Sequence, residues 1–339
     1  MTTTLWGIHG GRDGSADPLF REKNLLALAW TALGDLSQLE ADRTAFRTAL
    51  VEAYPETVAG AVPVEAGVLF RFVHEMAVGD LVAYPSREDR CIHLFEVKGP
   101  YQYDASEGAD FPHRRQAKLV KSLPRGSFSQ PALNEIGAAI TLFRIKSNAA
   151  EFLTKLADQA PEVSSPAGTE PEPEATSGGL DFSESTQDFL IGRLGLHLKG
   201  HPFAHFVGHL LNLMGYRTQI SPPGRDGGID ILVHSDPLGM QGPVMKVQVK
   251  SSEAQVGEKD VRDLAGLLHQ DERGLFVTLG TYNLDARKVA RGPRGIRLID
   301  GPELVNLICE HYDRIDHRYR SLLPLRRAWV PDTPIPTGE

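Results

Sequence analysis

The sequence predicts a mixed α+β domain at the N-terminal end and an α/β domain at the C-terminal end, joined by an acidic linker. A chain of 339 residues is longer than a single core usually extends, so two compact domains are expected. Segment 160–179 contains almost no large apolar residues. After it, short apolar runs alternate with amphipathic helices, as in a mixed sheet with helices on both faces. We therefore expect domains over residues 1–156 and 183–325, a linker over 157–182, and a tail over 326–339.

The linker prediction rests on composition and charge. Segment 160–179 is rich in Pro, Glu, Ser, Thr and Gly, and cannot bury enough apolar surface to offset the entropy of ordering. A loop of this length inside one domain is less common. Asp158 to Glu184 carries seven acidic residues and no basic one, so it supplies much of the net charge of −8. The bulk charge therefore neither supports nor excludes a nucleic-acid partner, which needs only a local basic face.

In the N-terminal domain, apolar and β-branched runs bounded by turn residues predict strands, and runs rich in Ala, Leu, Glu and Arg predict helices. The expected strands are Val68–Val73, Asp80–Tyr84 and Ile92–Val97, and the expected helices are Asn24–Leu33, Ala41–Ala53 and one beginning at Gln130, with Pro131 in its first turn. These elements indicate a small, curved α+β domain, and a barrel is one form that it could take.

In the C-terminal domain the periodicity is clearer. The expected helices are Ser183–Leu198, Pro202–Met214, Lys259–His269, Leu284–Ala290 and Pro302–Tyr312, and the expected strands are Arg217–Ile220, Ile229–Val233, Val244–Val249, Gly274–Leu279 and Ile296–Ile299. Three strands in succession, followed by helix and strand in alternation, predict a mixed sheet with helices on both faces.

Several classes of protein are not expected. No window approaches the apolar run of about 20 residues that a membrane helix needs, and the N-terminus lacks the features of a secretory signal. Cys91 and Cys309 flank no metal or redox spacing, so a cytoplasmic protein is expected. The glycine pairs at 10–11 and 227–228 lie outside any phosphate-binding glycine pattern, which argues against a nucleotide cofactor.

Two central strands carry the chemistry. Alternation places Ile231 and Val233 on one face of the first strand and Asp230 on the other. On the second strand, Gln248 and Lys250 share one face. If the two strands form an antiparallel hairpin, Asp230 lies roughly opposite Gln248, to within a residue or two, because the connection is long.

An aspartate, a glutamine carbonyl and a lysine suit metal-assisted hydrolysis of a phosphodiester. The oxygen ligands of Asp230 and Gln248 would hold Mg²⁺ or Mn²⁺, and the Lys250 ammonium would stabilise the developing negative charge. Taken singly, each residue would be an ordinary solvated strand residue. Their shared face and apolar neighbours favour a catalytic site built on these three.

The ordered runs Phe203–Tyr216, Gly224–Ile231 and Val247–Lys250, with Leu275–Asn283 and Leu298–Leu304, resemble the Mrr-type restriction endonuclease domain of the PD-(D/E)xK nuclease superfamily. The resemblance covers about residues 200 to 312. It implies that Asp230 is the motif aspartate, and that Gln248 and Lys250 form the QxK variant of the motif.

This chain departs from the family pattern in one helix. Members often have Phe-Glu where this sequence has Phe203-Ala204, and that glutamate can assist the metal. His205 could substitute for it, although a histidine on a helix face is more often structural. Asp226 is a second candidate metal ligand, with an equally good interpretation as a turn residue that caps backbone amides.

The N-terminal domain resembles the PUA/EVE-like modules that are fused to Mrr-type nucleases. The resemblance rests on the runs 6–11, 78–85, 96–103 and 112–115. It implies a small β-barrel that binds modified nucleobases or RNA. The aromatic residues would stack on a flipped base and the arginines would contact phosphates; the residues concerned are Trp6, Trp30, Tyr101, Tyr103, Arg114 and Arg115. Taken individually, Trp6 and Trp30 each fit better as core aromatic residues.

These observations predict a modification-dependent, type IV-like restriction endonuclease that cuts double-stranded DNA, with the N-terminal module as the reader. A structure-specific or repair nuclease with the same active site is an alternative. A DNA-binding defence protein with a decayed nuclease site is another, favoured by Ala204 and opposed by intact Asp230, Gln248 and Lys250. A homodimer is one way for a single-site nuclease to cut both strands.

Overall fold

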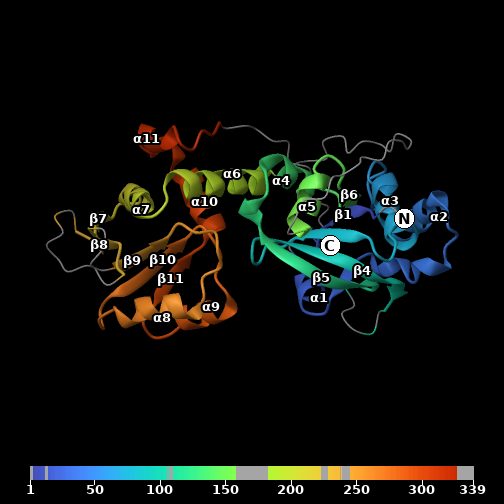
Figure 1. Ribbon diagram of the computed structural model, residues 1–339, viewed down its shortest axis with the longest axis horizontal. Coiled ribbons are helices and arrows are strands. Elements are labelled where there is room, and N and C mark those ends of the chain that lie inside the picture. The colour runs from blue at the N-terminus through green and yellow to red at the C-terminus, as the bar shows by residue number, and fades with distance from the viewer. Residues whose placement is uncertain are drawn as a thin grey trace. The chain divides into compact units, whose positions relative to one another are not determined.

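The computed structural model describes residues 3–11, 14–104, 106, 110–157, 182–222, 228–236, 238 and 245–326. The chain divides into two compact units (Figure 1). The first comprises Met1–Phe189 with Glu253–Gln255, and the second comprises Leu190–Ser252 with Val256–Glu339. The boundary falls inside helix α6, Phe182–His197, and the expected linker lies mostly outside the described residues.

The first unit is built around a six-stranded sheet in the order β2-β5-β4-β3-β1-β6. Its strands are β1 Leu5–Ile8, β2 Leu25–Leu28, β3 Leu81–Pro85, β4 Cys91–Tyr103, β5 His113–Pro124 and β6 Leu142–Arg144. Its helices are α1 Asp17–Arg21, α2 Arg43–Ala53, α3 Val62–Phe70, α4 Gln130–Ile136 and α5 Ala149–Leu156, and a π-helical turn, Arg71–Glu75, follows α3. The mixed α+β class is as expected.

The expected closed barrel is not found. Within the described part of the chain, β2 and β6 each pair with only one neighbour, so the sheet has two open edges. The long antiparallel pair β4–β5 bends this sheet through register shifts at Leu94/Phe95 and Val97/Tyr101. Curvature is present, but closure is not.

Two predicted elements of this unit were wrong. Val68–Val73 was expected as a strand, but it lies in α3 and the π-helical turn after it. Its apolar residues are buried on successive positions, and a fully buried helix gives the same apolar run as a buried strand. Asn24–Leu33 was expected as a helix, but Leu25–Leu28 pairs with β5 as a strand. Sheet pairing here overrides the local helix preference of Leu and Ala.

The second unit has a five-stranded sheet in the order β11-β10-β9-β8-β7. Its strands are β7 Arg217–Ile220, β8 Ile231–His234, β9 Met245–Lys250, β10 Arg273–Thr278 and β11 Ile296–Ile299. Its helices after α6 are α7 His201–Leu213, α8 Glu258–Gly266, α9 Leu284–Ala290, α10 Gly301–His311 and α11 His317–Arg320. The pairs β7–β8 and β8–β9 are antiparallel, and β9–β10 and β10–β11 are parallel, so the sheet is mixed as predicted.

Helices cover both faces of this sheet (Figure 1). Phe276 of β10 packs with Leu264 of α8 and Ala286 of α9 in a buried cluster on one face. On the other face lie α7 and α10, and the close approach of α7 to β7 is fixed by Gly208, where a Cβ would lie 2.6 Å from Ile220 Cδ1. The two layers leave the ends of β8 and β9 to form the site described below.

Among the described residues, none of the helices combines the length and apolarity needed to cross a membrane.

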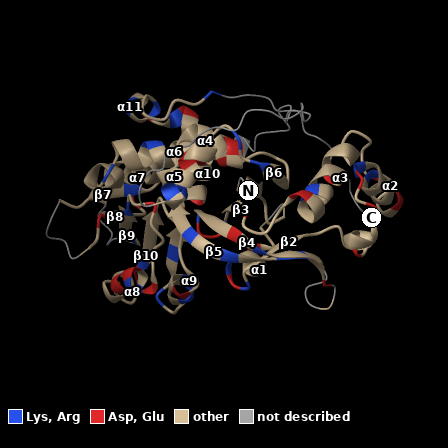
Figure 2. Cartoon of the chain, turned by 45° about the vertical axis from the view of Figure 1, so that its right-hand side comes forward, with Lys and Arg blue, Asp and Glu red and all other residues tan. Residues whose placement is uncertain are grey.

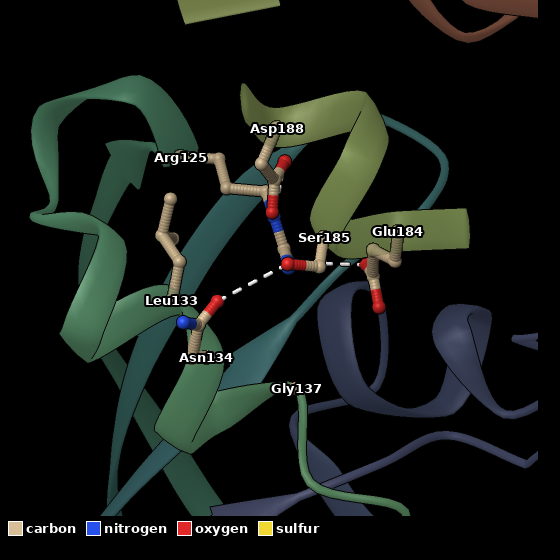
Figure 3. A pocket seen from close by; sticks show the side chains of 7 residues that line it. All are labelled: Arg125, Leu133, Asn134, Gly137, Glu184, Ser185 and Asp188. Atoms are coloured by element: carbon tan, nitrogen blue, oxygen red, sulfur yellow. Dashed lines mark hydrogen bonds and ion pairs between the residues drawn. The ribbon is translucent and has the colours of Figure 1, made fainter. Parts of the chain in front are cut away.

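A small pocket in the first unit holds an ion-pair cluster and not a catalytic group. Figure 3 shows Arg125 directed toward Asp188 of α6. Arg125 Nε lies 2.8 Å from Asp188 Oδ2, and Arg90 Nη2 lies 2.8 Å from Asp188 Oδ1. The lining residues are Arg125, Leu133, Asn134, Gly137, Glu184, Ser185 and Asp188. Because both buried arginines are matched by the carboxylate, the cluster ties the start of α6 to this unit.

Candidate active site

The paired strands β8 and β9 bring Asp230 and Gln248 together. Ile231 lies opposite Val247 in the antiparallel pair, so Asp230, one residue earlier, lies opposite Gln248, one residue later. The Asp230 N–H donates to Val247 O at 2.9 Å, which extends the ladder to this position. The register expected from the alternation of the two strands is the register observed.

The carboxylate of Asp230 is fixed by backbone hydrogen bonds. Its Oδ2 accepts the N–H of Val249 at 2.8 Å, and its main-chain carbonyl accepts the N–H of Ser221 at 2.9 Å. A hydrogen bond to a carboxylate is stronger than one between neutral groups. Asp230 therefore serves the fold at the junction of β7, β8 and β9, as well as any chemistry at the site.

Gln248 has a buried oxygen that lacks a partner. Its Oε1 is inaccessible to solvent and accepts no hydrogen bond from any described residue. Phe276 lies opposite Gln248 on β10, within the apolar cluster under α8. Gly228, at φ +96, lies beside its amide, since a Cβ there would be 3.8 Å from Gln248 Nε2. An unpaired buried acceptor costs about 1–3 kcal/mol, so a cation is the natural occupant of this position.

Lys250 ends β9 with its ammonium toward α8. Its Nζ lies 3.2 Å from Asp260 Oδ2, and the two side chains are 41% and 38% exposed. An ion pair that is this exposed contributes little to stability, so the ammonium remains available to a phosphate. Asp260 is the residue that sequence reasoning missed, because an acidic residue in the first turn of a helix is ordinary helix chemistry.

The donor set fits a hard cation. The carboxylate of Asp230 and the orphaned amide oxygen of Gln248 are oxygen ligands, which Mg²⁺ and Mn²⁺ prefer. Asp226 lies outside the described residues. The described part of the chain has no cluster of three or more His, Cys, Asp or Glu side chains that could hold a metal. Mg²⁺ commonly keeps several waters and takes one or two carboxylates together with substrate phosphates.

Helix α7 has no acid at the position where the family often has glutamate. Ala204 is fully buried among Phe203 and Phe206. His205 is exposed, and its ring contacts His201 on the same helix, with the two Nε2 atoms 3.2 Å apart.

Three of the residues predicted to bind nucleic acid are buried, which corrects the sequence interpretation. Trp6 is fully buried and donates from Nε1 to Asp80 Oδ2 at 2.9 Å, so its ring cannot stack on a base. Basic residues do mark β5 (Figure 2), but Arg114 is 5% exposed and Arg115 is 4% exposed. Arg114 Nη1 pairs with Asp104 at 3.0 Å, and neither arginine is available to a phosphate backbone.

Arg115 instead holds the backbone of the first unit. Its guanidinium donates to the carbonyls of Phe72, Val73 and Gly99 at 2.7, 2.9 and 3.1 Å. Burial lowers the pKa of Arg115 to about 10, which the Asp80 charge partly opposes. The arginine satisfies carbonyls at the end of the π-helical turn, where regular helix bonding stops.

Two of the three remaining aromatic rings, those of Tyr101 and Tyr103, lie beside His113, and Trp30 contacts it through its main-chain carbonyl. The Tyr101 ring stacks on His113 at a centroid distance of 6.0 Å, and the Tyr103 ring lies at 5.7 Å. The Leu36 N–H donates to Tyr101 Oη at 3.1 Å, and this hydroxyl lies 2.9 Å from His113 Nδ1. His113 Nε2–H donates to Trp30 O at 3.2 Å. Burial lowers the pKa of His113, which favours its neutral ring.

Trp30 sits in an unusual backbone conformation within this cluster. Its φ is 57 and ψ 49, in the left-handed region that a bulky residue seldom adopts. Its Nε1 donates to Glu65 at 3.0 Å, and its side chain is half-buried. Strain of this kind collects at functional sites, where surrounding contacts enforce it.

Comparison with known proteins finds restriction endonucleases. Residues 196–308 match the profile of a family described as restriction endonuclease. This region is similar to the Mrr restriction endonuclease family. The type IV methyl-directed restriction enzyme EcoKMrr of Escherichia coli strain K12 is 27% identical over 270 residues, which cover 72% of this chain and 86% of that protein. The match includes both Asp230 and the Gln248–Lys250 pair within 196–308.

Other comparisons are more distant. Residues 8–143 match a family described as a domain of unknown function, DUF8426. The solved structure of the DNA modification-dependent restriction endonuclease AspBHI has 16% identity and a TM-score of 0.33, covering 72% of this chain and 67% of that one. The MspJI restriction endonuclease in complex with a 27-mer oligonucleotide has 14% identity and a TM-score of 0.33, covering 79% and 71%.

Proposed function

We propose that the protein is a metal-dependent DNA endonuclease of the modification-dependent, type IV-like restriction class. The observation that carries the proposal is the buried Oε1 of Gln248, which has no partner among the residues that the structure describes and lies opposite Asp230. Two oxygen donors on adjacent strands, beside a partly exposed lysine, are what hydrolysis of a phosphodiester requires. The restriction endonuclease family match over 196–308 supports the same reaction.

In the proposed mechanism, the carboxylate of Asp230 and the Oε1 of Gln248 would hold Mg²⁺ or Mn²⁺. When bound, the cation would polarise the scissile phosphate and lower the pKa of a water. Lys250 approaches the phosphate from the end of β9 and stabilises the negative charge that develops as the water oxygen bonds to phosphorus. The phosphorus–oxygen bond to the leaving strand breaks, and that oxygen receives a proton from solvent. Asp260 positions the Lys250 ammonium before DNA arrives.

Asp230→Asn is the sharpest test of the chemistry. The amide oxygen of asparagine can still accept the Val249 N–H, so the fold keeps that hydrogen bond while the site loses a charge. We expect cleavage of plasmid DNA in Mg²⁺ or Mn²⁺ to fall by at least 100-fold, on the order of a lost metal ligand or charge-stabilising group. DNA binding by gel shift and the circular dichroism spectrum should be unchanged.

Lys250→Ala should lose cleavage to a similar extent. Lys259→Ala is its matched control, because the Lys259 side chain is 91% exposed on α8. This variant should cut DNA at the wild-type rate. Chelation of the metal should stop cleavage in the wild type without unfolding it. Undiminished cutting by Asp230→Asn or Lys250→Ala would contradict the site, and DNA binding without cleavage by the wild type in either metal would indicate a decayed nuclease.

The first unit is proposed as the reader of modified DNA. A site that contacts phosphate and metal reads no base, so discrimination has to come from elsewhere. Tyr101 and Tyr103 lie against His113, Trp30 contacts that histidine through its main-chain carbonyl, and these three aromatic side chains could stack on an extruded base. With Arg114 and Arg115 buried, backbone contacts must come from other residues.

The reader proposal is tested by titrating the full chain against matched duplexes with and without modified cytosine. We expect tighter binding of the modified duplex, and Tyr103→Ala, which removes a ring that is 37% exposed, should reduce that preference. Val120→Ala on β5 is a control, because Val120 is 45% exposed and outside the cluster. Equal affinity for both duplexes in the wild type would defeat the reader, and leave the nuclease proposal standing.

A further inference from the structure

The start of helix α7 carries two histidines whose rings converge. His201 and His205 lie one turn apart on the same face of the helix. Their Nε2 atoms are 3.2 Å apart, with ring centroids at 4.7 Å and ring planes at 90°. His205 is exposed and His201 is half-buried, so solvent reaches the pair.

This separation matches the distance between two imidazole ligands of one metal ion. With metal–nitrogen bonds of about 2.0–2.1 Å and tetrahedral angles, two ligand nitrogens lie about 3.3–3.4 Å apart. The structure holds them at 3.2 Å without any rearrangement of the helix. The same distance suits a hydrogen bond in which one ring donates its Nε2–H to the Nε2 of the other. A metal would replace this hydrogen bond once the donor ring carries its proton on Nδ1 instead.

We propose that His201 and His205 form a surface site for a divalent transition metal of the Zn²⁺, Ni²⁺ or Cu²⁺ class. Imidazole nitrogens favour these ions, whereas Mg²⁺ and Mn²⁺ favour the oxygen donors of Asp230 and Gln248. The two sites therefore differ in the ion they take. Two protein ligands leave the other positions on the ion open to water.

The third histidine of this helix is already engaged. His209 Nε2 accepts the N–H of Asp316 at 3.1 Å, and its ring packs against Tyr319 at a centroid distance of 5.2 Å. The described residues hold no cluster of three or more potential metal ligands, in agreement with a site of two histidines.

The metal would stabilise a helix start that lacks a side-chain cap. The N-cap residue is Gly200, at φ 73, and it supplies no side-chain hydrogen bond to the first turn. Its own N–H donates to Ser251 Oγ at 2.9 Å, directly after Lys250. A metal that links positions i and i+4 would hold this first turn in helical form.

The test uses the full chain and Cu²⁺ as the probe, read by electron paramagnetic resonance and by calorimetric titration. We expect one tight Cu²⁺ per chain with two equatorial nitrogens. His201→Ala and His205→Ala should each lower the affinity at least tenfold and leave a single nitrogen in the spectrum. His205→Gln, which keeps a polar side chain at the exposed position, should do the same.

His269→Ala is the matched control, because His269 is exposed and lies after α8, away from this helix. It should bind Cu²⁺ like the wild type, and a hundredfold excess of Mg²⁺ should not displace the ion. The proposal would be overturned if the wild type bound Cu²⁺ no more tightly than His201→Ala or His205→Ala. It would also be overturned if His269→Ala lost as much Cu²⁺ affinity as those variants. DNA cleavage by the wild type in Mg²⁺ is measured separately, so failure here leaves the nuclease proposal untouched.

Discussion

Replacing Gln248 with leucine should make the metal-free protein more stable while abolishing cleavage. The Oε1 of Gln248 is buried and has no partner among the described residues, at a cost of about 1–3 kcal/mol. Leucine has a similar length and removes the orphaned acceptor beside Phe276. We expect the free energy of unfolding in chelator to rise by about 1 kcal/mol, a Tm increase of about 2–4 °C for a domain of 150–250 residues.

The assay is thermal unfolding of wild type and variant, first in chelator and then in Mg²⁺, together with plasmid cleavage. Mg²⁺ should stabilise the wild type more than Gln248→Leu, because a ligand that binds only the folded state adds to its stability. Gln219→Leu is the matched control, since Gln219 is exposed on β7 and should change stability by no more than about 0.5 kcal/mol. A Gln248→Leu protein that is less stable than wild type in chelator, or that cuts DNA normally, would refute the reasoning.

Three further predictions concern the fold. Arg115→Ala should destabilise the protein by about 3 kcal/mol or more in urea titration, because three buried carbonyls lose their donor; Lys118→Ala, exposed on the same strand, is the control, and equal stability of the two variants would contradict the role of Arg115. Burial lowers the pKa of His113, so as the pH falls the unfolded chain binds a proton at this histidine before the folded chain does. The free energy of unfolding should therefore decrease as the pH drops below about 6.5. If the urea midpoint of His113→Gln depends on pH as strongly as that of the wild type, other groups cause the loss. Limited proteolysis should cut first within 160–179 and give two stable fragments, and protection there equal to that of the cores would refute the linker.

The C-terminal fold was largely predictable because its short apolar runs are separated by turn residues and several of its helices, such as α7 and α8, are amphipathic. Alternation along β8 and β9 predicted which residues share a face, and an antiparallel pairing placed Asp230 roughly opposite Gln248, which is the register observed. The long connection between the two strands left that register open by a residue or two until the pairing was seen. The N-terminal helix α3 was not predicted, because its apolar residues are nearly continuous and periodicity alone does not distinguish such a run in a helix from one in a buried strand.

The sequence by itself determined the mixed sheet and its helices, and it predicted a site at Asp230, Gln248 and Lys250. Only the tertiary structure decided how those residues are held. The Val249 N–H donates to the Asp230 carboxylate, and the Lys250 ammonium donates to the Asp260 carboxylate. The tertiary structure also decided that Arg115 is structural, since its carbonyl partner Phe72 lies 43 residues away along the chain. Local periodicity reports which face a side chain occupies. The atoms that meet it there come from distant segments, and their positions are set by packing.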